Sequence, residues 1–203
     1  MAVRKKSRAA YHHGDLRRAV IDAALVAIER DGIAALSLRE LARKLAVSHQ
    51  APYRHFADKD ALLAAIADEG FRTLVQRLRA GPPLTGDVTR ALTESGVAYV
   101  RFAVEHPAHY RVMFATGGER RDPLATPGGA YDLLATGVAR GQEAGVLPAG
   151  PKQELALLCW TVAHGLAMLA IDGKLGPAPA ALATARATIA LQVRTLAVAA
   201  TAR

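Results

Sequence analysis

A short polar segment between two amphipathic helical patterns constrains the fold of this chain more than any other feature. Residues 47–56 read VSHQAPYRHF and hold a proline, two histidines, a glutamine, a tyrosine and an arginine where a core helix would hold leucines. The preceding pattern, residues 38–45, gathers its leucines on one helical face, and the following pattern, residues 59–79, contains no proline. Two helices joined by a turn of three or four residues, the second short and polar, are typical of a helix-turn-helix.

Capping residues mark where the helices of this region begin. The sequence SLRE, which starts at Ser37, predicts a capping box in which Ser37 caps one helix and Glu40 reaches back to its amide. Ser48 is expected to cap the polar helix, and Asp58 is expected to cap the helix that follows it.

The rest of the chain is also expected to be helical. No alternating strand pattern persists, alanine is abundant and aromatic residues make up only 5% of the sequence, which favours helices. A Gly- and Pro-rich linker, AGPPLTGD, separates two parts. We therefore expect an all-α fold, with an N-terminal three-helix helix-turn-helix domain followed by a helical bundle. The expected ranges are an arm at 1–14, the first domain at 15–60 and the second at 61–203, with helices at 15–31, 38–45, 59–79, 88–105, 107–115, 128–144, 153–172 and 179–201.

The basic charge is concentrated near the N-terminus. The net charge is +8, and residues 1–60 hold 12 Lys and Arg against 7 Asp and Glu, which leaves 14 against 11 for the remainder. Such a basic end indicates a polyanionic partner. The arm residues Arg4, Lys5, Lys6 and Arg8 are expected to be attracted to a nucleic-acid backbone and not to read bases. The YHH sequence beside them lacks further ligands at metal spacing, so we expect no metal site and no cofactor.

One apolar stretch, residues 155–171, allows two interpretations. Its sequence, LALLCWTVAHGLAMLAI, is close to the minimum length of a membrane span. The interpretation that we favour is a helix buried on all sides by its own protein or by a partner subunit. The N-terminus has no apolar signal-peptide region, and the single cysteine, Cys159, suits a reducing compartment, so a cytoplasmic location is expected.

The composition of the polar helix fits the reading of a DNA groove. His49 and Gln50, in its first turn, are positioned to meet base edges, since glutamine pairs with adenine and histidine offers a donor or an acceptor. Residues further along, with Lys59, are expected to bond phosphates. Pro52 would present a rigid apolar face to a thymine methyl group. The full set expected to contact DNA is Ser37, Arg39, Ser48, His49, Gln50, Ala51, Tyr53, Arg54, His55 and Lys59, with Lys5, Lys6 and Arg8 of the arm.

The sequence around this helix resembles the DNA-binding domain of the tetracycline-repressor (TetR) family. The resemblance covers residues 15–65 and includes Leu36-Ser37-Leu38, Val47-Ser48, Tyr53-x-His55-Phe56 and Lys59-x-x-Leu62. The sequences HPAHYRVMF and WTVAHGL, further on, are similar to a branch with a Trp–His–Gly motif in its effector domain. The resemblance implies a bacterial, nucleoid-associated repressor that forms a homodimer of nine- or ten-helix subunits. It also implies a pseudo-palindromic double-stranded operator, a dimer interface built from the last two helices, and release by a small-molecule effector bound in the second domain.

Bulky residues of the second domain are candidates for an effector cavity between helices, or for ordinary core. These residues are Tyr99, Phe102, Tyr110, Met113, Phe114, Tyr131, Trp160, His164 and Met168. His164 is the expected polar anchor, although a core histidine with satisfied hydrogen bonds is an equal alternative. The glycine-containing loop 116–129 is expected to be a lid or a surface loop.

Two other functions are open to the sequence. An enzyme would use Cys159 or His164, but side chains five residues apart on a helix point in different directions, and an apolar environment raises the pKa of a thiol. A DNA-binding protein that responds to another protein, instead of to a small molecule, is the remaining alternative.

Overall fold

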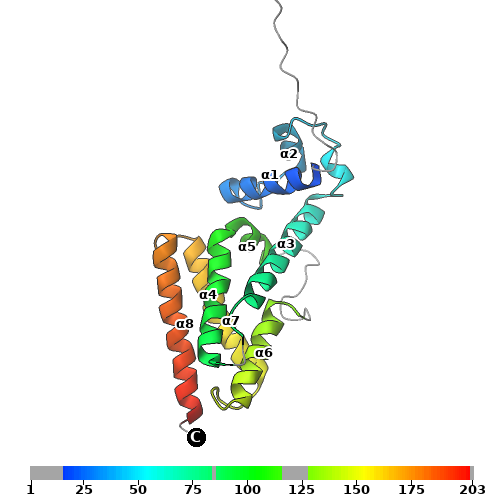
Figure 1. The fold of residues 1–203 in the computed structure, drawn as a ribbon. Coiled ribbons are helices and arrows are strands. Elements are labelled where there is room, and N and C mark those ends of the chain that lie inside the picture. The colour runs from blue at the N-terminus through cyan, green and yellow to red at the C-terminus, as the bar shows by residue number, and fades with distance from the viewer. Residues whose placement is uncertain (1–15, 84–85, 116–127, 202–203) are drawn as a thin grey trace, which may run out of the picture. The chain divides into compact units, whose positions relative to one another are not determined.

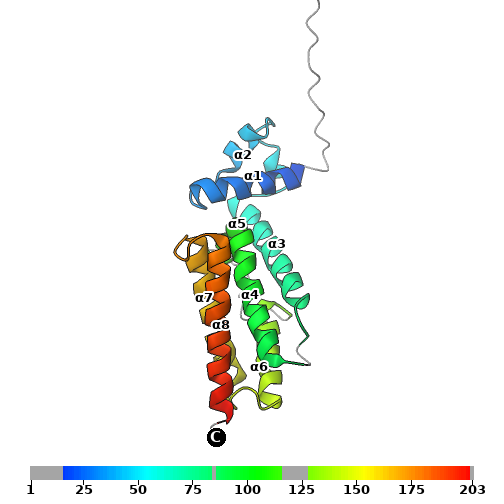
Figure 2. The same cartoon turned by 60° about the vertical axis from the view of Figure 1, so that its left-hand side comes forward.

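The computed structural model describes residues 16–83, 86–115 and 128–201, and every regular element in these ranges is a helix (Figures 1 and 2). The elements are α1 (Leu16–Asp31), α2 (Leu38–Lys44), the 3₁₀ helix η1 (Pro52–Arg54), α3 (Lys59–Arg79), α4 (Val88–Glu105), α5 (Pro107–Met113), α6 (Ala130–Glu143), α7 (Lys152–Ile171) and α8 (Ala178–Thr201). The all-α prediction is confirmed. Apart from the polar helix after α2, the expected α-helices agree with these within two residues at each end. The described ranges hold eight α-helices and one 3₁₀ helix, where the resemblance implied nine or ten helices.

The chain divides into two compact units, Met1–Ile66 and Ala67–Arg203, and α3 continues from the first into the second. The first unit is built on apolar faces with helical spacing. α1 buries residues three, four and seven positions apart, and α2 buries its own short face. Its core comprises Val20, Ile21, Ala24, Ile28, Leu36, Leu38, Leu41, Ala42, Phe56, Leu62, Leu63 and Ile66.

The end of α2 contains a residue in an unfavourable conformation. Ala46 has a φ of 54°, the left-handed region that glycine adopts most easily. The Val47 N–H donates to the Ala42 carbonyl at 3.1 Å and the Ala46 N–H donates to the Arg43 carbonyl at 3.2 Å, which is a Schellman-type helix end. These two hydrogen bonds therefore stabilise a left-handed backbone conformation that the Cβ of Ala46 makes unfavourable.

We expect Ala46→Gly to raise the free energy of unfolding by about 1 kcal/mol, because the left-handed conformation penalises a Cβ by about this amount. Urea unfolding followed by circular dichroism measures the change. Ala51→Gly is the matched control, since Ala51 has φ −62° and ψ −45° and should lose stability on gaining backbone freedom. Equal losses from both substitutions would contradict the assignment of strain to Ala46.

The predicted capping box at the start of α2 is wrong. Ser37 has the extended backbone of an N-cap, but its side chain makes no capping hydrogen bond. The Glu40 carboxylate instead accepts hydrogen bonds from Arg43 Nε at 2.9 Å and from Arg43 Nη2 at 2.8 Å. A charged arginine one turn away on the same face competes successfully for this carboxylate. The cap predicted for Asp58 is present, since its carboxylate accepts from the Ala61 N–H at 2.7 Å.

The polar segment is also not the α-helix that the sequence predicts. A turn leads into η1, and here the Ala51 N–H donates to the Ser48 carbonyl and the His55 N–H donates to the Pro52 carbonyl, each three residues back and at 3.0 Å. Pro52 occupies the first position of η1, where a missing N–H costs nothing. The proline that is awkward inside an α-helix is therefore well placed here. Because Pro52 is buried, the expected thymine contact through its ring is wrong.

In the second unit, α4 is the central helix and packs against α5, α6, α7 and α8 (Figures 1 and 2). Asp87 caps α4 by accepting a hydrogen bond from the Arg90 N–H at 2.9 Å. Gly96 lets α8 approach closely, because a Cβ there would lie 3.1 Å from the Ile189 side chain. The largest fully buried side chains of this unit are Tyr110, Phe102, Leu74, Val100, Val112 and Val138.

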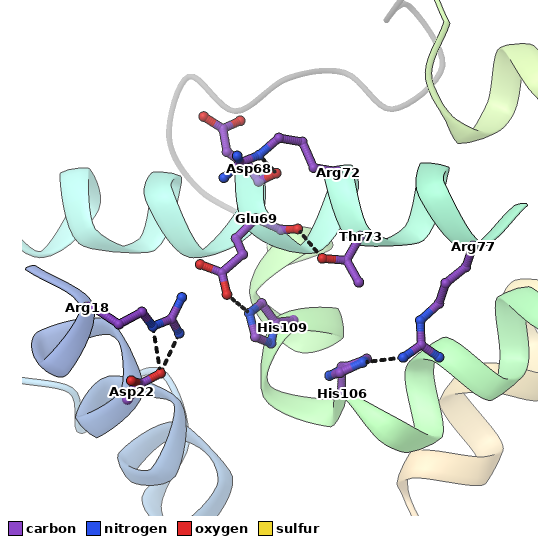
Figure 3. A network of polar contacts seen from close by, with 9 residues as sticks. All are labelled: Arg18, Asp22, Asp68, Glu69, Arg72, Thr73, Arg77, His106 and His109. Carbon is purple, nitrogen blue, oxygen red and sulfur yellow. Dashed lines mark hydrogen bonds and ion pairs between the residues drawn. The ribbon is translucent and has the colours of Figure 1, made fainter. Parts of the chain in front are cut away.

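The second half of α3 lies against α5 at a close contact. A Cβ at Gly70 would lie 2.5 Å from Met113 Sδ and 3.3 Å from the Cβ of His109, so glycine permits this approach. Polar contacts flank it (Figure 3): Glu69 meets His109 Nε2 at 3.2 Å, and Arg77 Nη2 donates to His106 Nε2 at 2.8 Å. Burial lowers the pKa of His106, and the neighbouring Arg77 charge lowers it further, which keeps the ring neutral as an acceptor.

Candidate nucleic-acid interface and ligand cavity

The segment between α2 and α3 presents polar side chains to solvent and buries its apolar ones. Pro52 and Phe56 are buried, and the Arg17 guanidinium lies 5.2 Å from the centre of the Phe56 ring. Tyr53 is 44% exposed even though its ring is large. The exposed polar side chains are Ser48, His49, Gln50, Tyr53, Arg54 and His55, and Ala51 is half-buried.

The other residues expected to contact DNA differ in their surroundings. Arg39, on α2, is exposed, and Ser37 is half-buried. Lys59 Nζ donates to the Ala34 carbonyl at 3.0 Å, so this ammonium group ties the start of α3 to the loop before α2. Lys5, Lys6 and Arg8 lie outside the described residues, as do Arg4 and the YHH sequence.

The second unit encloses a cavity of about 330 Å³. Residues of α3, α4, α6, α7 and α8 form its wall, together with Phe114 and the Gly128–Gly129 turn. Its volume is in the range that holds small organic ligands. The wall is mainly apolar and aromatic and includes Phe71, Leu74, Val75, Leu78, Leu92, Tyr99, Phe114, Tyr131, Leu134, Cys159, Trp160, Ala163, Ile189 and Val193.

A closed hydrogen-bond network lies behind one wall of this cavity. Tyr110 Oη is 2.8 Å from His164 Nδ1 and 3.1 Å from Tyr99 Oη, and Tyr99 Oη is 3.0 Å from the same imidazole nitrogen. Trp160 Nε1 donates to Tyr99 Oη at 3.1 Å. The Tyr110 hydroxyl donates to Tyr99 Oη, and the Tyr99 hydroxyl donates to Nδ1 provided that the imidazole proton is on Nε2. A neutral His164 therefore satisfies the whole group.

Burial shifts the pKa values of this network in directions that keep every member neutral. It lowers the pKa of His164, raises the pKa of Tyr99 to about 12 and raises the pKa of Tyr110. Protonation at Nδ1 would remove the acceptor on which both hydroxyls converge. The network is therefore a structural feature of the neutral state.

We expect the midpoint temperature of thermal unfolding to fall as the pH drops below 6.5, the ordinary pKa of histidine. The unfolded chain binds a proton on His164 in this range while the folded chain does not, so acid favours unfolding. His164→Asn keeps an acceptor without a titrating group and should flatten the fall. Part of the fall in midpoint temperature should persist in this variant, because the pKa of His106 is also lowered in the folded chain. A pH profile unchanged by the substitution would contradict a neutral His164.

The outer sides of α7 and α8 are apolar and exposed. Leu158 of α7 is 48% exposed and Leu191 of α8 is 58% exposed, and Gln192 Nε2 donates across to the Leu158 carbonyl at 3.2 Å. The exposed large apolar residues of these helices are Leu157, Leu158, Leu169, Leu191 and Val198. Among the described residues, α7 alone has the length and composition of a membrane-crossing helix, a test that core helices of soluble proteins also pass. In the single chain, α7 is buried on one side and not all round.

Comparison with known proteins identifies the family. Residues 20–66 match the model of bacterial regulatory proteins of the tetR family, and residues 92–195 match the model of the tetracyclin repressor-like C-terminal domain. The chain belongs to the TetR family. It is therefore a transcriptional regulator with a DNA-binding helix-turn-helix, and not an enzyme.

Individual TetR-family and related structures extend this similarity over nearly the whole chain. A protein of unknown function from Rhodococcus sp. RHA1 is 33% identical, with a TM-score of 0.73 over 94% of this chain and 100% of that one. A TetR variant from Acinetobacter baumannii AYE, solved in complex with minocycline, is 21% identical and has a similar fold, with a TM-score of 0.57 over 89% of this chain and 93% of that one. The uncharacterized HTH-type transcriptional regulator YobS of Bacillus subtilis (strain 168) is 25% identical over 114 residues, 56% of this chain and 59% of that protein.

In this TetR-family chain, the residues predicted for an effector cavity fall into two groups. Tyr99, Phe114, Tyr131 and Trp160 line the cavity. The other predicted residues are not among its lining residues: Phe102, Tyr110, Met113, His164 and Met168. Tyr110 and His164 lie behind the wall and hydrogen-bond to Tyr99, which lines the cavity. The Met113 side chain fills the space beside Gly70. The loop predicted as a lid lies outside the described residues except for Gly128 and Gly129.

The sequence interpretation missed most of the wall contributed by α3 and α8. Val75 and Leu78 recur with Phe71 and Leu74 at helical spacing, which is a detectable signal for one buried face of α3. Nothing in the pattern distinguishes a face that meets a cavity from a face that meets other side chains. Burial raises the pKa of Cys159 to about 11, so this wall residue is a thiol at neutral pH. The described residues contain no cluster of three His, Cys, Asp or Glu side chains that could hold a metal.

Proposed function

We propose that this regulator is a homodimeric repressor that a small-molecule effector releases from a pseudo-palindromic operator. The observation that carries the proposal is the course of α3. This single helix begins at Lys59, directly after the exposed polar segment, and its later turns supply Phe71, Leu74 and Leu78 to the cavity wall. The helix that follows the DNA-contacting segment therefore also supplies part of the cavity wall.

In the proposed complex, His49 and Gln50 meet base edges in the major groove. The exposed positions of both side chains, at the turn before η1, support this role. Phosphates are contacted by Ser37, Arg39, Ser48, Tyr53, Arg54, His55 and Lys59, while Ala51 lies against a base or sugar. The arm residues Lys5, Lys6 and Arg8 add backbone attraction.

The dimer forms through α7 and α8 of each subunit, which together make a four-helix interface. The exposed leucines of these two helices support this arrangement, because an apolar surface of this kind is stable when another protein surface covers it. Two-fold symmetry then brings two recognition segments to two half-sites of the operator. The dimer works in the bacterial cytoplasm on nucleoid DNA.

Release follows from a coupling free energy between the cavity and the operator. In one conformation of the dimer, the spacing of the two recognition segments does not match the operator half-sites. An effector that binds this conformation more tightly increases its population and so lowers the affinity for the operator. The cavity supports a small-molecule effector over a protein signal, since its wall is apolar and its volume is about 330 Å³. The related structure with bound minocycline supports the same kind of ligand site.

DNase I footprinting on the DNA that flanks the gene tests the operator assignment. The expected result is one protected region with two half-sites about one helical turn apart at moderate salt. A protein that protects no region more strongly than bulk DNA would overturn the proposal. The same assay tests the release step. A small molecule that binds the protein should abolish the protection when it is added.

We expect His49→Ala and Gln50→Ala to relax base preference, each lowering discrimination at one base pair by about 1–3 kcal/mol. Arg54→Ala should instead weaken binding to all sequences and lower the slope of log K against log salt by about 1. Arg30→Ala serves as the control, because Arg30 pairs with Asp31 at the end of α1. Competition binding with operator and mutated operators at several salt concentrations separates the two effects. Equal losses of discrimination from both kinds of change would contradict this division.

A further inference from the structure

We propose that the cavity accepts an apolar organic anion, with its charged group beside Arg72 and Arg79 and its apolar body among the aromatic rings. This inference names the chemical class of the ligand and rests on the proposed function of the cavity as an effector site. Four features of the second unit support it.

The first feature is the charge of the wall. Arg72 and Arg79 border the cavity, whereas no Asp or Glu is among its described lining residues. Both arginines are exposed, so they mark the solvent side of the cavity, while the aromatic residues beyond them are buried or half-buried. Among the described lining residues, a cationic ligand would meet two like charges and no carboxylate.

The second feature is the hydrogen bonding of these arginines. Arg72 Nε donates to the Asp68 carbonyl at 3.2 Å, and Arg79 Nη2 donates to the Gly128 carbonyl at 3.3 Å. Each guanidinium has five N–H donors, so donors remain on both for a carboxylate, phosphate or sulfonate group. Arg77, on the same helix, differs because it pairs with the Glu105 carboxylate and contacts His106. Figure 3 shows Arg72 on the side of α3 opposite His106 and His109.

The third feature is the saturation of the polar groups in the interior wall. The Tyr99 hydroxyl and the Trp160 N–H bond to each other and to the network with Tyr110 and His164. They therefore have no need of polar ligand atoms, and burying an uncompensated charge beside them would be costly. The charged group of a ligand is best accommodated at the arginine side.

The fourth feature is the aromatic content of the wall. A connected series of ring contacts runs through Phe71, Phe114, Trp160 and Tyr131, with centroid separations of 5.8 Å, 6.3 Å and 6.1 Å in turn. Ring faces and edges of this kind bind apolar bodies, and they also bind cations in the absence of competing positive charge. The two arginines decide between these alternatives in favour of the anion.

The sole tryptophan of the chain, Trp160, provides a direct measurement because it lines the cavity. The full-length protein is titrated at pH 7.5 with decanoate, decan-1-ol and decylammonium, which share one apolar body and are transparent where tryptophan emits. Decanoate should change Trp160 emission with an affinity about tenfold higher than decan-1-ol, the factor expected from one charge-assisted hydrogen bond. Decylammonium should bind more weakly than decan-1-ol.

The double variant Arg72→Gln/Arg79→Gln should lose the advantage of decanoate and keep the affinity for decan-1-ol. Both positions are exposed, and an unchanged unfolding temperature verifies the fold. Arg90→Gln is the matched control, because Arg90 is an exposed arginine of α4 outside the cavity wall. It should keep the full preference. Equal affinities for decanoate and decan-1-ol, a preference for decylammonium, an unaltered preference in the double variant, or no emission change with any of the three probes would overturn the inference.

Operator binding measured in parallel separates this inference from the proposed function. Decanoate that binds at Trp160 and leaves the operator complex intact would support the ligand class and count against release by an effector. A neutral or cationic probe that binds best and dissociates the operator complex would support release and overturn the ligand class.

Discussion

Leu158→Asp combined with Leu191→Asp is expected to convert the protein into a monomer and to lower its affinity for the operator more than about a hundredfold. The two leucines lie on the exposed sides of α7 and α8, 48% and 58% exposed. In the proposed dimer they are buried, and each aspartate would place an unpaired charge in that apolar interface. A monomer then binds each half-site separately and loses the effective concentration that two linked recognition segments provide.

Sedimentation velocity measures the oligomeric state, and fluorescence anisotropy with a labelled operator measures the affinity. Val26→Asp is the control for oligomeric state, because Val26 is an exposed apolar residue of α1, 63% exposed, outside α7 and α8. It should remain dimeric. A double variant that sediments as a dimer would show that another surface joins the subunits.

The second large effect is expected at Tyr110, the largest fully buried side chain. Tyr110→Ala should lower the free energy of unfolding by about 3–5 kcal/mol, because it removes an aromatic ring from a packed core and leaves a cavity. Tyr110→Phe keeps the ring and removes the hydroxyl that reaches His164 and Tyr99, so a loss of about 1–3 kcal/mol is expected.

Urea unfolding followed by Trp160 fluorescence measures both variants, since Trp160 belongs to the same network. Tyr131→Phe is the control because the Tyr131 hydroxyl donates to the Gln153 carbonyl at an exposed site, where water replaces the lost partner. Its stability should stay close to that of the unchanged protein. A Tyr110→Phe variant as stable as Tyr131→Phe would show that the buried hydroxyl contributes little.

The helices could be predicted from the sequence because their signals are local. Asp58 and Asp87 precede α3 and α4, and each accepts a hydrogen bond from an N–H of the first turn. The capping box failed because Glu40 has two possible partners, and the sequence does not rank the Ser37 amide against the Arg43 guanidinium. The resemblance of the DNA-binding domain could be identified for the same reason, since its residues lie within one short continuous region.

The conformation of the polar segment and the composition of the cavity wall were harder to predict from the sequence. Pro52 disfavours a regular α-helix around it, but the choice of a turn followed by η1 also depends on burying Pro52 and Phe56. The cavity wall brings together residues as distant in sequence as Phe71 and Val193. Periodicity identifies the buried face of each helix and gives no information on whether side chains from the other helices fill the space in front of it.

The close contact at Gly70 sets the mechanics of α3. Met113 and His109 prevent α3 from moving nearer to α5 at this residue, whereas the side-chain contacts of Glu69 and Arg77 on either side can stretch or exchange. Any tilt of α3 within the second unit would therefore pivot near Gly70 and be largest toward Arg79, about 14 Å away at a rise of 1.5 Å per residue.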